Sequence, residues 1–241
     1  MTQAERLTFL IEYLISENKE LKSFHGMPSF HILVEENARK RLLRSLMNVR
    51  PPKPVTKDFL NIQDEYLQGE KTEKGIISLA DIPFVKSGIH LWQGDITRLS
   101  VDAIVNAANS AMLGCFVPCH GCIDNAIHSA AGIELRLECS HIMEKQKTKE
   151  PTGKAKITKA YNLPCRYVLH TVGPIIYGEV TQKDCNLLSD CYRSCLELAA
   201  EYQLKSIAFC CISTGEFHFP NEKAAEIAIQ TVKDYQNKNP S

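Results

Sequence analysis

The stretch Ala103-Ile104-Val105-Asn106-Ala107-Ala108-Asn109-Ser110 passes directly from an apolar, β-prone run into a polar turn. The run predicts a buried strand over 103–106. Similar runs predict strands at 90–92, 167–171 and 206–212, and helical periodicity occupies 124–145, 187–202 and 222–236. Strands that alternate with helices favour an α/β sheet covered by helices, with ligands bound beyond the carboxyl ends of the strands.

The N-terminal segment is helical in pattern. Apolar residues at helical spacing predict amphipathic helices over 3–17 and around 42–47. Prolines at positions 51, 52 and 54 end the second helix, because proline lacks the amide donor, and we interpret them as a connector. We therefore divide the chain into a helical N-terminal extension, 1–68, and an α/β domain, 69–241, and expect the extension to serve as scaffold.

The overall composition is that of a globular protein. Of the 241 residues, 44% are hydrophobic, and 28 basic residues balance 28 acidic ones, so bulk charge supports neither a nucleic-acid nor a membrane partner. No apolar run approaches the length of a transmembrane helix. The best candidate signal peptide, 7–15, contains Glu12 and lacks a basic flank, so we expect a cytoplasmic location.

The ten cysteines all lie at or after Cys115. In a reducing compartment, clustered cysteines indicate metal binding or catalysis rather than disulfides. The densest cluster is the segment Leu113-Gly-Cys-Phe-Val-Pro-Cys-His-Gly-Cys-Ile-Asp124, which offers Cys115, Cys119, His120 and Cys122. Thiolate and imidazole ligands suit Zn²⁺.

Three further motifs follow predicted strands or turns: Gln93-Gly-Asp-Ile-Thr97, His170-Thr-Val-Gly-Pro174 and Ser213-Thr-Gly-Glu-Phe-His-Phe-Pro220. Each is weak alone. Asp95 is compatible with a simple turn residue, and Asn106 and Asn109 with a closed turn. The last motif offers hydroxyls and amides that suit a phosphate ahead of a helix N-terminus.

Together, in this order and spacing, these motifs resemble the macrodomain family of ADP-ribose-binding modules. The resemblance implies a three-layer α/β/α macrodomain with a mixed central sheet, here over 69–241, and a helical N-terminal extension. It also implies that Asp95 recognises the adenine amine, with Ile96 beside the ring, and that Asn109 reaches the distal ribose. Backbone amides of two loops would bind the diphosphate and Phe217 would pack on the distal ribose; the second loop supplies Ser213, Thr214, Gly215, Glu216 and Phe217.

The cysteine segment stands where most macrodomains carry a run of glycines. With the N-terminal extension and the Ser213–Pro220 motif, it is similar to the zinc-containing macrodomains of bacteria and fungi. That resemblance implies Cys115, His120 and Cys122 as ligands, with a fourth position open as in catalytic zinc sites. Two alternatives remain: Cys119 closes a structural tetrahedral site, or Cys119 and Cys122 form a C-x-x-C thiol pair without a functional metal.

Asp124 aligns with the residue that orients a water in hydrolytic macrodomains; the alternative is a helix cap. The resemblance implies a zinc-dependent hydrolase that removes mono-ADP-ribose from acidic side chains of a modified protein, and family analogy points to a lipoyl-carrier protein. The competing hypotheses are a non-catalytic ADP-ribose reader with a structural zinc and a thiol oxidoreductase. We expect His128 to pack inside its helix and Cys210 and Cys211 to be buried.

Overall fold

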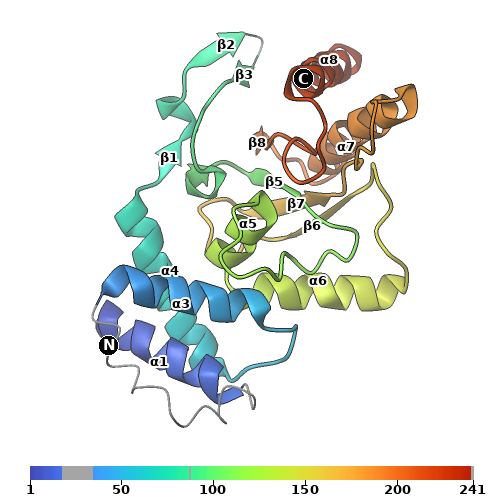
Figure 1. Ribbon diagram of the computed structural model, residues 1–241. Helices are drawn as coiled ribbons and strands as arrows, with labels where there is room; N and C mark the ends of the chain where they lie inside the picture. Colours follow the sequence, from blue (N-terminus) through green and yellow to red (C-terminus); the bar gives the residue numbers. More distant parts are fainter. Residues whose placement is uncertain (18–34, 87, 240–241) are drawn as a thin grey trace.

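A four-stranded mixed sheet, in the order β6-β7-β5-β8, forms the centre of the fold (Figure 1). The computed structural model describes residues 1–17, 35–86 and 88–239. Strand β5 is parallel to β7 and β8, whereas β6 is antiparallel to β7. The sheet is therefore mixed, as expected; its strands are β5 Ala103–Ala107, β6 Ala155–Lys159, β7 Tyr167–Thr171 and β8 Ile207–Ala208.

Helices cover both faces of this sheet (Figure 1). Successive side chains of a strand point to opposite faces, so Val105 packs with Leu188 of one helical layer while Ile104 packs with Ile127 of the other. No helix in the described ranges is long and apolar enough to cross a membrane. The packing of helices on both faces of the sheet confirms the three-layer architecture. The covering helices are α7 Gln182–Glu201 and α8 Asn221–Lys238 on one face, and α5 Ile123–Ala131 and α6 Ile133–Gln146 on the other.

Short strands precede the central sheet. The expected strand at 90–92 is only partly right, since the paired residues are 89–90, and the strand expected over 206–212 is reduced to 207–208. Strand β6 was not expected, because its sequence, AKITK, contains two lysines and only one large apolar residue. The short elements are β1 Ile77–Ser78, η2 Leu79–Asp81, β2 Phe84–Lys86, β3 Ile89–His90, η3 Ile96–Arg98 and β4 Leu99–Ser100, with β1 parallel to β4 and β2 antiparallel to β3.

The N-terminal extension is a group of helices with its own core, which includes Leu10, Leu43 and Phe59. The prolines do not end this unit, because another helix begins directly after them. The Thr56 hydroxyl caps that helix by accepting a hydrogen bond from the Phe59 amide at 3.2 Å. The expected boundary at 68 lies inside the new helix; the described helices are α1 Gln3–Glu17, α3 Glu36–Val49 and α4 Lys57–Lys74.

The prediction of a single helix over 124–145 is wrong, because the helix is interrupted at Gly132, between α5 and α6. Gly132 has φ of +96°, and a Cβ there would lie 2.7 Å from Gln63 Nε2. Gln63 Oε1 in turn accepts a hydrogen bond from the Ile133 amide at 2.9 Å. A side chain from α4 thus caps α6, which joins the extension to the second domain.

The cysteines are all free. Cys139, Cys165, Cys185, Cys191 and Cys195 are buried, as apolar residues would be. The expectation of burial is wrong for Cys211, which is exposed, while Cys210 is partly buried. The prediction placed both cysteines in a strand, but β8 ends at Ala208. Cys210 and Cys211 therefore belong to the loop that leads towards α8.

Replacing Gly132 by Ala should lower the free energy of unfolding by about 1–3 kcal/mol, since a non-glycine residue is strained at this φ and its Cβ meets Gln63. Urea denaturation monitored by circular dichroism measures the change. Gly121→Ala is the matched control, because a Cβ at Gly121 has no neighbour within 4 Å. Equal effects of the two substitutions would contradict this role of Gly132.

Candidate active site

The loop between β5 and α5 gathers three metal-ligand side chains. The ligand atoms of Cys115, His120 and Cys122 all lie within 4.8 Å of one another, and Cys115 Sγ is 3.7 Å from His120 Nδ1. On its other side, His120 Nε2 lies 3.5 Å from Glu216 Oε1. A carboxylate behind a ligating histidine fixes the tautomer and orientation of the ring, as is usual at zinc sites. The donor set and its support therefore fit Zn²⁺.

The Cys122 thiol is not poised to ionise by itself. Burial, together with the neighbouring Cys115 thiol, raises the pKa of Cys122 to about 11. Its Sγ accepts a hydrogen bond from the Asn125 amide at 3.4 Å and so forms the N-cap of α5. A redox or nucleophilic cysteine needs a lowered pKa, so the raised pKa of Cys122 disfavours the thiol-oxidoreductase hypothesis.

Cys119 points away from the other cysteines of the loop. Its Sγ lies 3.2 Å from Ser45 Oγ and 3.3 Å from the Arg41 carbonyl oxygen, both on α3. Its backbone amide donates to Asn48 Oδ1 at 2.9 Å. The three-ligand arrangement is therefore the one that the side chains present, and it leaves a fourth position for water or substrate.

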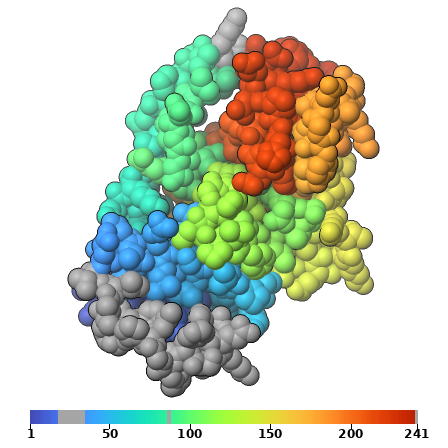
Figure 2. Space-filling view, viewed as in Figure 1, coloured from blue at the N-terminus to red at the C-terminus, as the bar shows by residue number. Residues whose placement is uncertain are grey.

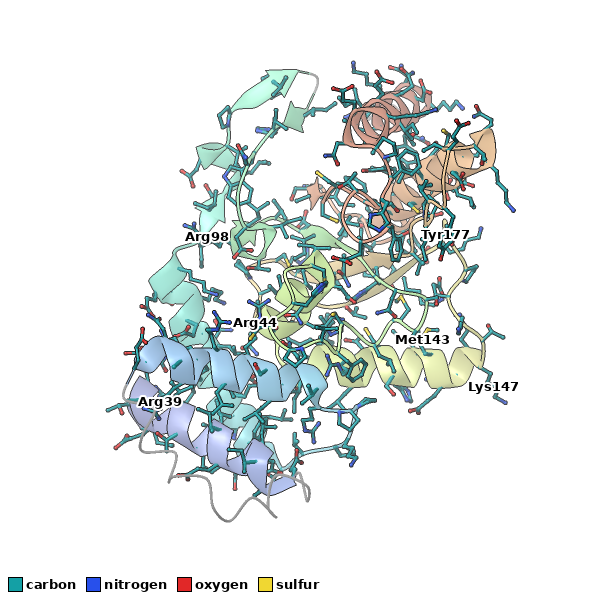
Figure 3. The ribbon with its side chains drawn as sticks, viewed as in Figure 1. Arg39, Arg44, Arg98, Met143, Lys147 and Tyr177 are labelled. Atoms are coloured by element: carbon teal, nitrogen blue, oxygen red, sulfur yellow. The ribbon has the colours of Figure 1, made fainter. Side chains whose placement is uncertain are left out.

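Side chains of the extension hold the loop in place. Arg44 of α3 donates to Asn125 Oδ1 at 2.7 Å and to the His120 carbonyl at 3.1 Å, and it lies between α3 and α5 (Figure 3). In the space-filling view, the blue atoms of α3 abut the yellow-green atoms of the second domain (Figure 2). Sequence reasoning missed Arg44 and Asn48, because a helical arginine or asparagine gives no local sign of a distant partner.

Asp124 is a buried carboxylate held by two asparagines. Asn106 Nδ2 donates to Asp124 Oδ1 at 2.8 Å, and Asn109 Nδ2 donates to Oδ2 at 3.2 Å. Burial raises the pKa of Asp124 to about 6, and the two asparagine donors oppose that shift. The capping role considered for Asp124 is wrong, because Cys122 caps the helix. His128 is buried as expected, with Nε2 3.5 Å from Asp124 Oδ1.

The loop that follows β8 folds back on itself. The amides of Thr214, His218 and Phe219 bond to carbonyls within the loop and its approach, whereas those of Gly215, Glu216 and Phe217 donate no hydrogen bond to any described residue. Consecutive backbone amides without a protein partner are the groups with which loops of this kind bind phosphates. The Phe217 side chain packs on a small cluster formed by Ala108, Met112 and Val172.

Asp95 and Ile96 lie apart from the metal loop. The exposed Asp95 carboxylate accepts from the Thr97 amide and hydroxyl through Oδ1, and Oδ2 has no donor among the described residues. Asp95 lines a cavity of about 480 Å³ between the extension and the second domain, with Arg44 and Arg98 also on its wall (Figure 3). Ile96 was expected to lie beside the adenine ring. Its side chain is only 8% exposed and packs in the core, so little of its surface is left for contact with a ligand.

The structure thus brings together Asn109, Asp124, Glu216 and the Cys115–His120–Cys122 triad at one end of the sheet. The fold and this site define an α/β/α protein with a Cys₂His loop beside a buried carboxylate. The Macro domain family model matches residues 105–228, and the chain belongs to the macrodomain family.

Curated relatives extend over the whole chain. A protein-ADP-ribose hydrolase of Treponema medium is 59% identical, covering 100% of this chain and 92% of its own length. One from Staphylococcus aureus is 46% identical, covering 95% and 85% respectively. These relatives confirm the resemblance and the hydrolase class that the sequence predicts.

Solved structures agree with the fold. A Trypanosoma brucei macrodomain in complex with ADP-ribose has a TM-score of 0.62 and 31% identity, covering 81% of this chain and 84% of that one. An Oceanobacillus iheyensis macrodomain with ADP has a TM-score of 0.56 and 42% identity, covering 61% and 75%. The smaller coverage of this chain in the second match leaves a larger part of it outside the alignment.

Replacing Cys115 or Cys122 by Ser should remove bound zinc, whereas Cys119→Ser should retain about one zinc ion per chain, because the Cys119 thiol faces α3. Elemental analysis of the purified variants measures the metal content. Cys119→Ser is both the matched control and the critical case. Loss of zinc from it would mean that the loop rearranges into a closed four-ligand site.

Proposed function

We propose that this chain is a zinc-dependent hydrolase that removes mono-ADP-ribose from modified acidic side chains of a target protein. The main observation in support is that Cys115, His120 and Cys122 converge next to the Asn109–Asp124 pair, while the Cys119 side chain contacts α3 instead. A three-ligand site beside a buried carboxylate is the arrangement of a catalytic metal rather than a structural one. The names of the curated relatives support the hydrolase part of this proposal.

The contacts suggest a separate role for the metal ion, for Asn109 and for Asp124 in the proposed reaction. Zn²⁺ at this site would supply a Lewis acid for a bound water or a ribose hydroxyl. Asn109 holds one oxygen of Asp124 and would orient the distal ribose, which fixes the reacting group close to the carboxylate. Asp124, with a pKa raised to about 6 by burial, is suited to accept a proton near neutral pH.

The rest of the ligand would be bound by groups that the structure leaves available. The unpaired amides of Gly215, Glu216 and Phe217 would hold the diphosphate, with Ser213 and Thr214 shaping the loop, and the Phe217 ring would pack against the distal ribose. Asp95 would accept a hydrogen bond from the adenine amine through its unpaired oxygen. The preference for ester links to acidic residues and the lipoyl-carrier target rest on the resemblance alone.

Release of ADP-ribose from a protein modified on Asp or Glu should be lost after chelation and regained with zinc, because the fourth coordination position is needed for turnover. The measurement compares enzyme as purified, chelated and reconstituted. Cys119→Ser serves as the matched control and should behave like the parent enzyme. Binding of ADP-ribose without any release would instead favour the reader function with a structural zinc.

Replacing Asp95 by Ala should weaken ADP-ribose binding about 10- to 150-fold and leave the zinc content unchanged, since a hydrogen bond to a charged group contributes about 1.5–3 kcal/mol. Calorimetric titration with ADP-ribose and elemental analysis give the two readouts. Asp81→Ala is a suitable control, because Asp81 is an exposed capping carboxylate at η2. Unchanged affinity in Asp95→Ala would remove Asp95 from the adenine subsite.

A further inference from the structure

A row of buried polar side chains crosses three neighbouring strands beneath Asp124. Asn106 on β5 lies directly opposite His170 on β7, and Thr158 of β6 lies diagonally beyond it. The distances are 3.2 Å from Asn106 Nδ2 to His170 Nδ1 and 2.9 Å from His170 Nε2 to Thr158 Oγ1. All three residues are at most 2% exposed. The row therefore begins at Asp124 and ends at the buried Thr158 on β6, the strand at the edge of the sheet.

The hydrogen bonds determine where the protons lie. The Asp124 carboxylate needs a donor, so Asn106 presents its Nδ2 group, one hydrogen to Asp124 Oδ1 and the other to His170 Nδ1. His170 Nδ1 must then be the acceptor, and Nε2–H donates to Thr158 Oγ1. Burial lowers the pKa of His170 to about 3, so the ring is neutral and has one N–H.

Asn106 and His170 form a coupled pair with two possible states. The opposite tautomer of His170 would point Nδ1–H at Asn106, and the amide would have to flip. A flipped amide turns Oδ1 towards the Asp124 carboxylate and repels it. In the observed state Asn106 Oδ1 has no partner among the described residues, so the amide orientation is set by its Nδ2 contacts.

We propose that His170, held with Nδ1 as the acceptor and with its Nε2–H stabilised by the Thr158 hydroxyl, is a positioning residue that sets the orientation of Asn106 and, through it, of the Asp124 carboxylate. This inference rests on the proposed function, because Asp124 is its endpoint. Thr158 is the remote element of the row: it touches neither Asp124 nor any ligand of the metal loop.

A metal ion is the alternative use of this region. Ligand atoms of His128, Cys139 and His170 also lie within 4.8 Å of one another. A neutral histidine offers one lone pair, and that of His170 is taken by Asn106. Metal binding there would break the contact that holds Asp124, so the hydrogen-bonded row accounts better for His170.

The test is Thr158→Val, which keeps the side-chain shape and removes the hydroxyl 2.9 Å from His170 Nε2, so that only the weak contact with Cys139 Sγ at 4.0 Å is left for Nε2–H. We expect kcat for ADP-ribose release to fall about tenfold or more, by analogy with other residues that fix a histidine tautomer, with ADP-ribose affinity and zinc content unchanged. Thr158→Ser, which restores the hydroxyl, should recover turnover. Thr231→Val is the matched control, because Thr231 is also buried and hydrogen-bonded but lies on α8.

Wild-type turnover in Thr158→Val, or an equal loss in Thr231→Val, would overturn the proposal. A second readout does not depend on hydrolysis: nitrogen-15 NMR of the histidine rings, with the His170 signals identified from a His170→Phe spectrum. We expect an Nε2–H ring in the parent protein and a population of the Nδ1–H form in Thr158→Val. The same tautomer in both proteins would refute the role of Thr158, even if the chain released no ADP-ribose and the proposed function itself failed.

Discussion

The buried guanidinium of Arg136 is the interaction on which the arrangement of this molecule depends. It donates to the carbonyls of Met47 and Asn48 near the end of α3 at 3.0 and 2.8 Å, and to the Leu113 carbonyl in the metal loop at 2.7 Å. The same group lies over the Phe116 ring at 4.2 Å. One cation thus binds the carbonyl end of an extension helix and the loop that carries the metal ligands.

The N-terminal extension therefore helps to hold the loop that carries Cys115, His120 and Cys122 in its observed conformation. In a loop rich in glycine, the backbone can approach phosphates because it lacks side chains. Here the corresponding loop carries cysteines, and its shape is held from outside by Arg44, Asn48 and Arg136. Gln63 does the same for the start of α6. An isolated second domain would lose these partners and leave several buried backbone groups unpaired, which is costly.

The sheet contributes a second kind of constraint, which is electrostatic. Asp124 is removed from water, so its charge depends on Asn106 and Asn109 as donors. Each of those asparagines follows from the position of β5 at the centre of the sheet. The C-terminal residues of β5 lie beside β7, and the helix after the loop returns Asp124 to the same point. The carboxylate directly follows the metal loop in the chain, and the end of β5 brings Asn106 and Asn109 to it.

The sequence by itself determined the layers of the fold and indicated a metal site. Apolar runs at 103–106 and 167–171 predict the central strands, and the spacing of Cys115, His120 and Cys122 indicates a metal site, because these signals are local. Only the tertiary structure decided that Cys119 faces α3, that Gly132 interrupts a helix and that α4 follows the prolines. It alone aligned Asn106, His170 and Thr158. These features depend on contacts between residues far apart in the chain, and local periodicity carries no record of such contacts.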